Sequence, residues 1–114
     1  MTATSRTDAV VIRDWAPATP TDGLASYREL LRVPSLAVGR FVAPPGHEDS
    51  QDPHSEDEIY FVTAGEAHLI LDNRTHPVQA GSVVYVPAGT AHRFTNIRVR
   101  IDVLVFFAPC PPRA

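Results

Sequence analysis

The side chains best suited to chemistry in this sequence are two histidines and one glutamate, His54, Glu58 and His92. His54 and Glu58 are four residues apart, and Glu58 opens the β-branched and aromatic run at residues 58–63. Side chains of a strand alternate between its two faces, so positions two or four apart can converge on one side. His92 opens another run directly after the Pro87-Ala88-Gly89 turn. Two imidazoles and one carboxylate from separate strands suit a divalent metal, and this donor set is typical of iron(II) with open positions. Zinc, nickel or manganese would fit nearly as well.

Asp52 is the candidate for a fourth ligand. It precedes His54 by two residues and could point the same way, although Pro53 between them fixes φ and removes a backbone donor. Gln51 could supply an amide oxygen instead, and we prefer Asp52. A carboxylate here would favour iron, manganese or nickel. If Asp52 is not a ligand, it is the preferred general base beside a metal-bound substrate, with Glu58 as the second candidate.

Tyr60 is the uncharged polar candidate for the same cavity. It shares strand parity with Glu58, and Phe94 shares parity with His92, so both aromatic side chains are expected to line the cavity. The Tyr60 hydroxyl could donate or accept a hydrogen bond in catalysis, or Tyr60 could be a packing residue with its hydroxyl at the rim. Arg40, on an upstream strand, could bind a substrate carboxylate through two hydrogen bonds, or could be a solvated arginine.

Short strands separated by glycine, proline and asparagine turns must position these side chains. Residues 26–32 tolerate helix or strand, and their short run before Pro34 favours strand. Further strands are predicted at 9–15, 36–43, 58–63, 67–71, 75–79, 82–86, 91–95 and 99–107. Many short strands without a long helix indicate a β-sandwich or barrel.

Two longer patterns resemble the paired signatures of the cupin superfamily. Residues 81–96 read G-x5-P-x-G-x2-H-x3-N, with every fixed position occupied. Residues 46–65 resemble G-x5-H-x-H-x3-E-x6-G, except that Asp52 stands where the family has its first histidine. The resemblance implies an all-β fold, the double-stranded β-helix or cupin jelly-roll barrel, in which two antiparallel sheets form a short barrel.

The resemblance also implies that His54, Glu58 and His92 bind one divalent transition metal, with iron(II) favoured. The remaining histidines are expected to be ordinary surface or hydrogen-bonded residues: His47, His68 and His76. Cupins include dioxygenases, isomerases, cyclases, decarboxylases and lyases, so membership selects no reaction. We expect a metal-dependent enzyme that acts on a small, metal-chelating organic substrate. The alternative is a non-catalytic cupin that binds a small molecule as a sensor or accessory module, and turnover distinguishes the two.

Composition narrows the function classes further. The 114 residues predict one domain over 1–114, with a flexible arm at 1–8 and an irregular tail at 109–114. The net charge is −3 and the ten basic residues are scattered arginines, so no nucleic-acid surface is expected. No apolar run approaches the ~20 residues of a membrane span, and no secretory signal is recognisable. The single cysteine, Cys110, forms no internal disulfide, and a soluble cytoplasmic protein is expected.

A homodimer is the expected assembly. Residues 9–15 read as a strand that needs a partner, and small cupins often pair through sheet edges and exchange N-terminal segments. A free strand edge is a liability that pairing with a second copy would cover.

Overall fold

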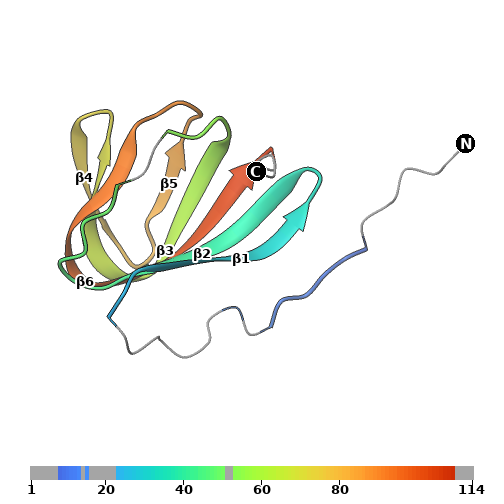
Figure 1. Ribbon diagram of the computed structural model, residues 1–114, viewed down its shortest axis with the longest axis horizontal. Coiled ribbons are helices and arrows are strands. Elements are labelled where there is room, and N and C mark those ends of the chain that lie inside the picture. The colour runs from blue at the N-terminus through green and yellow to red at the C-terminus, as the bar shows by residue number, and fades with distance from the viewer. Residues whose placement is uncertain (1–7, 14, 16–22, 51–52, 110–114) are drawn as a thin grey trace, which may run out of the picture.

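The computed structural model describes residues 8–13, 15, 23–50 and 53–109. Within these ranges every regular element is a β-strand (Figure 1). The strands are β1 (Ser26–Val33), β2 (Leu36–Ala43), β3 (Asp57–Leu71), β4 (Arg74–Gln79), β5 (Val83–Val86) and β6 (His92–Ala108). The described part of the chain contains no helix long and apolar enough to cross a membrane.

The six strands form one antiparallel sheet that curls into a barrel. Their order is β1-β2-β6-β3-β4, and β5 pairs with the first part of β3, on the edge opposite β6. Figure 1 shows β3 and β6 curving around one side of the barrel, so that each long strand belongs to both of its layers. The expected all-β jelly-roll is confirmed, and its two layers are continuous through these two strands.

The two long strands are the main difference from the predicted elements. Predicted strands 58–63 and 67–71 are one strand, β3, and predicted strands 91–95 and 99–107 are one strand, β6. The β3–β6 register shifts three times between Val62 and His68, which marks bulges that bend a strand without ending it. Gly65 lies within this bend with φ +96°, and a Cβ on it would lie 2.1 Å from the Arg100 carbonyl oxygen. Gly65 therefore permits a close strand crossing where a strand end was predicted.

Most other predicted strands are confirmed. Residues 26–32 and 36–43 form β1 and β2, and the segments predicted at 75–79 and 82–86 form β4 and β5 to within a residue. The strand predicted at 9–15 is wrong over its described residues, which pair with no strand edge of this chain; residues 8–13 run outside the barrel (Figure 1). The predicted arm and tail lie outside the described residues, apart from Asp8 and Pro109.

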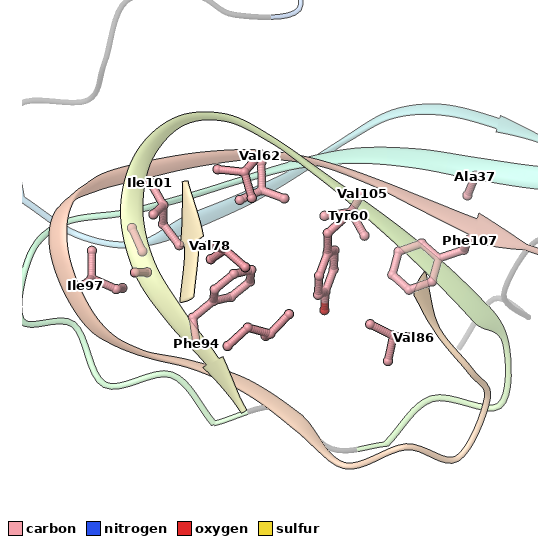
Figure 2. Close-up of a cluster of buried hydrophobic side chains, with 14 residues drawn as sticks. Ala37, Tyr60, Val62, Val78, Val86, Phe94, Ile97, Ile101, Val105 and Phe107 are labelled. Atoms are coloured by element: carbon pink, nitrogen blue, oxygen red, sulfur yellow. The ribbon is translucent and has the colours of Figure 1, made fainter. Parts of the chain in front are cut away.

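Strand parity decides which side chains fill the barrel. Along the first half of β3, exposed and buried residues alternate, with Glu58, Tyr60 and Val62 inward. Figure 2 shows the Tyr60 ring pointing into the interior between Phe94 and Phe107. Each fully buried side chain of this size stabilises the fold by about 1.5–3 kcal/mol. The same alternation that builds the core therefore places a carboxylate in it.

Candidate metal centre

Three distant segments bring the two histidines and the glutamate together. His54 lies in the loop before β3, Glu58 is the second residue of β3, and His92 is the first residue of β6. Atoms that could ligate an ion, one from each side chain, all lie within 4.8 Å of one another. The structure therefore assembles the trio chosen from the sequence, while its role as a metal site stays a prediction.

Two backbone contacts hold the histidine segments against each other. The Gly89 amide donates to the His54 carbonyl at 2.7 Å, and the Ala88 amide donates to Asp57 Oδ1 at 2.9 Å. Both donors belong to the turn that delivers His92, and both acceptors belong to the segment that delivers His54 and Glu58. The Pro87-Ala88-Gly89 turn that was recognised in the sequence thus holds His92 close to His54 and Glu58.

The His92 ring has a defined hydrogen-bonding role. Its Nδ1 lies 2.8 Å from the Thr90 carbonyl oxygen. A carbonyl only accepts, so Nδ1 carries a proton, and Nε2 is the ring atom that accepts when the ring is uncharged. That Nε2 faces Glu58 Oε2 at 3.2 Å, and Oε2 has no hydrogen-bond donor among the described residues. Two acceptors that face each other in a buried place require a proton or a cation between them.

The second histidine completes the donor set from the open side. His54 Nε2 lies 4.0 Å from Glu58 Oε1, and the two imidazole centroids are 5.3 Å apart. The Glu58 side chain is 2% exposed, whereas that of His54 is 37% exposed. An ion held here would be enclosed by protein on the Glu58 and His92 side, and ligands could approach past His54. A nitrogen, nitrogen, oxygen set of this kind fits a divalent transition metal.

A cavity of about 270 Å³ opens next to the trio. Its lining includes His54, Glu58 and Tyr60, together with aromatic side chains of β2 and β6. The volume is at the small end of the roughly 300–1,000 Å³ usual for ligand pockets. The candidate metal-binding trio thus lies beside a compact pocket.

Residues 39–107 match the cupin domain family. The chain belongs to this family. An uncharacterized protein of Streptomyces coelicolor is 45% identical over 84 residues, which are 74% of this chain and 80% of that protein.

Two solved structures have a similar fold. An RmlC-like cupin protein of Desulfovibrio desulfuricans has a TM-score of 0.76 at 18% identity, covering 90% of this chain and 99% of the other. The DMSP lyase DddQ of Ruegeria pomeroyi has a TM-score of 0.71 at 24% identity, covering 75% of this chain and 47% of the lyase. At these identities the likeness is one of fold alone.

The buried carboxyl of this cupin is easily protonated. Burial raises the pKa of Glu58 from 4.5 to about 7; the neighbouring Tyr60 phenol lowers the pKa and the Glu56 charge raises it. The Tyr60 hydroxyl belongs to a residue that is 1% exposed, and by hydrogen-bond geometry it has no partner among the described residues. Burial, together with the charges of Glu58 and Asp49, raises the pKa of Tyr60 far above its ordinary value, so the phenol stays protonated.

Arg40 is not a substrate-binding residue in this cupin. Its Nε donates to Asp102 Oδ1 at 2.9 Å and its Nη2 to Asp102 Oδ2 at 2.5 Å, and the arginine is 7% exposed. Trp15 covers the guanidinium at 5.8 Å. Arg40 does make two hydrogen bonds to a carboxylate, but that carboxylate is Asp102 and not a substrate. The predictions of a substrate-binding Arg40 and of a solvated Arg40 are therefore both wrong.

Several pocket residues were not found from the sequence. Tyr27 of β1 and Asp49 of the loop after β2 line the cavity, and Asp49 Oδ2 also accepts the Phe94 amide at 2.9 Å. Parity along β1 alone could not identify Tyr27, because its pairing with Phe41 of β2 is what puts both side chains on the cavity wall. Asp52 and Gln51, the candidates for a fourth ligand, lie outside the described residues. His68 and His76 lie on β3 and β4, away from the trio.

Proposed function

We propose that this cupin is a metal-dependent enzyme that acts on a small, metal-chelating organic substrate, in a dioxygenase, isomerase, cyclase or lyase type of reaction. The observation that carries the proposal is the convergence of possible ligand atoms of His54, Glu58 and His92 within 4.8 Å of one another, around a buried Glu58 Oε2 that has no hydrogen-bond partner among the described residues. One solved structure of similar fold is a DMSP lyase, so the fold is known to support an enzyme. Similarity of fold does not identify the reaction of this chain.

His54, Glu58 and His92 are the proposed ligands, and iron(II) is the favoured ion ahead of zinc, nickel or manganese. A divalent ion at this position would polarise the oxygens of a chelating substrate. The Thr90 carbonyl orients His92, as an outer hydrogen bond does for most metal-bound imidazoles. Tyr60 would donate a hydrogen bond to a substrate oxygen, because this residue lines the cavity and its hydroxyl has no partner among the described residues. Asp52 stays the preferred fourth ligand; if it is not a ligand, it is the preferred base, with Glu58 as the second candidate.

Metal analysis followed by a turnover assay tests the proposal. Chelator-treated protein is loaded separately with iron(II), zinc, nickel or manganese, and each form is incubated with small diketones and hydroxy ketones in the presence and absence of air. We expect about one ion per chain and product in at least one loaded form, detected by mass spectrometry. The competing function, a ligand-binding cupin, predicts bound ligand without product in every form.

Asp52 is expected to matter for the metal more than for folding. Asp52→His, which restores the family pattern, should raise affinity for zinc or nickel by about tenfold or more, because imidazole is a stronger ligand for these ions. Asp52→Ala should lower turnover or shift the preferred metal. Competition titrations against a fluorescent chelator measure the affinities, and Gln51→Ala tests the neighbouring candidate. If both Asp52 variants have the same metal affinities and the same turnover as the parent protein, Asp52 has no role in the metal site.

A second copy of the chain is the proposed partner. Val10 and Val11 are 58% and 74% exposed, and the described segment 8–13 pairs with none of the described strands. Light scattering should give about twice the chain mass of 12.4 kDa at micromolar concentration. Val10→Asp with Val11→Asp should halve that mass, because charges would enter the covered segment. Val99→Asp on β6 is the matched control, and a parent protein that stays at the single-chain mass contradicts the proposal.

A further inference from the structure

The cavity beside the metal centre has aromatic walls. Phe41 and Phe94 are stacked with centroids 5.8 Å apart and an interplanar angle of 20°, and Tyr60 lies 5.3 Å from Phe94. Phe107 meets the His54 ring edge-on at 5.4 Å. Aromatic rings prefer offset-stacked or edge-to-face neighbours at such spacings. A flat ring that entered beside His54 would therefore find suitable contacts on more than one wall.

The cavity is lined by acidic side chains and by no arginine or lysine among the described residues. The acidic residues are Asp49 and Glu58. Arg40, the arginine that the sequence offered for a substrate carboxylate, is held by Asp102. A free carboxylate on a ligand would thus be buried near two protein carboxyl groups without a protein cation to compensate it, which is unfavourable.

Two phenols supply the neutral polar groups of the cavity. Tyr60 lines the cavity, and its buried hydroxyl has no partner among the described residues. Tyr27 lies at the more open end, with its ring over Gly39, where a Cβ would be 2.0 Å from the Tyr27 hydroxyl. Burial and the charges of Glu29 and Glu58 raise the Tyr27 pKa to about 12, so this hydroxyl also stays a donor. Both hydroxyls can bind carbonyl or enol oxygens.

We propose that the cavity selects neutral aromatic ligands whose chelating group consists of carbonyl or enol oxygens, and that it rejects the same ligands when they carry a carboxylate. The chelating part of this inference rests on the proposed function. The preferences for an aromatic ring and for neutrality rest on the walls and charges of the cavity alone.

Three β-diketones test the inference by calorimetric titration. Benzoylacetone is neutral and aromatic, benzoylpyruvate replaces its methyl group by a carboxylate, and acetylacetone lacks the ring. The metal-loaded protein should bind benzoylacetone about tenfold or more tightly than either of the others, since each lacks one matched feature. Benzoylpyruvate binding as tightly as benzoylacetone overturns the charge preference, and acetylacetone binding as tightly overturns the aromatic one.

Two variants with matched controls connect the preferences to named residues. Asp49→Asn removes one negative charge but keeps an oxygen for the Phe94 amide, so it should tighten benzoylpyruvate binding about fivefold and change benzoylacetone binding less than about twofold. Glu66→Gln removes the same charge from an exposed position on β3 and should change neither. Phe41→Leu should reduce the preference for benzoylacetone over acetylacetone at least about threefold, whereas Phe61→Leu on the outer face should not. Equal effects in a variant and its control overturn the assignment.

The metal-free protein separates this inference from the proposed function. If no ion binds, the metal-dependent enzyme fails as a proposal, and the same titrations on the metal-free protein still decide the ring and charge preferences. If an ion binds stoichiometrically but the three diketones bind alike, the metal centre stands and the inference fails. Absence of binding by benzoylacetone at millimolar concentration in both forms also overturns the inference.

Discussion

Replacing His92 by alanine should remove most bound metal and leave the barrel folded. His92 is fully buried beside Glu58, and its Thr90 contact points Nε2 at the carboxylate. Loss of an outer hydrogen bond to a ligand typically costs roughly 10–100-fold in metal affinity, and loss of the ligand itself should cost more. Elemental analysis after dialysis should therefore fall from about one ion per chain to below about 0.1. The β-sheet signal in circular dichroism should be unchanged.

Two further variants make this result decisive. His92→Gln fills most of the space of the ring, so it guards against a collapse of the fold caused by the cavity that alanine leaves. His76→Ala removes an exposed histidine of β4 and should keep full metal content. Stoichiometric metal in both His92 variants would show that the ion, if one binds, lies elsewhere.

Glu58→Gln should abolish metal binding and also change how the stability of the metal-free protein depends on pH. The folded carboxyl has a pKa of about 7 against an ordinary value of 4.5, mainly because of burial. The native state therefore holds a proton that the unfolded chain has lost within this window, so the stability contribution is full below pH 4.5 and is lost as pH rises through about 7. The melting temperature of the metal-free parent should accordingly fall between pH 5 and pH 8.

The glutamine variant should lack this carboxyl-dependent decline. Its amide can donate to Nε2 of His92 where the ionised carboxylate cannot, so above pH 7 the metal-free variant should be more stable than the metal-free parent. A divalent ion at 100 times its dissociation constant should raise the melting temperature of the parent by about 10 °C at pH 8 and leave that of the variant unchanged. Glu66→Gln, on the exposed face of the same strand, should follow the parent in both measurements. A parent whose melting temperature is constant from pH 5 to pH 8 contradicts the prediction.

The local chemistry of turns and strands was determined by the sequence itself. Gly81, Pro87 and Gly89 mark the approach to His92, and β-branched and aromatic runs mark β2 and the first half of β3. The two-residue period then placed Glu58 and Tyr60 on the inward face, where the structure finds both. These features depend on neighbours close in the chain, so they can be inferred without knowledge of the fold. The resemblance of two segments to the paired cupin signatures predicted the barrel, and the family match confirms this fold.

Only the tertiary structure decided how the strands bend and what each polar side chain meets. Whether Gly65 ends a strand or bends one depends on the Arg100 carbonyl that approaches it from β6. The choice between a free and a paired Arg40 depends on Asp102, which is 62 positions away in the chain. Tyr27 reaches the cavity because β1 pairs it with Phe41 of β2, and its ring occupies the space that a side chain at Gly39 would fill. The facing acceptors on Glu58 and His92 arise from a turn held against a loop. Each of these outcomes is set by contacts between distant segments, which alternation and turn propensity do not specify.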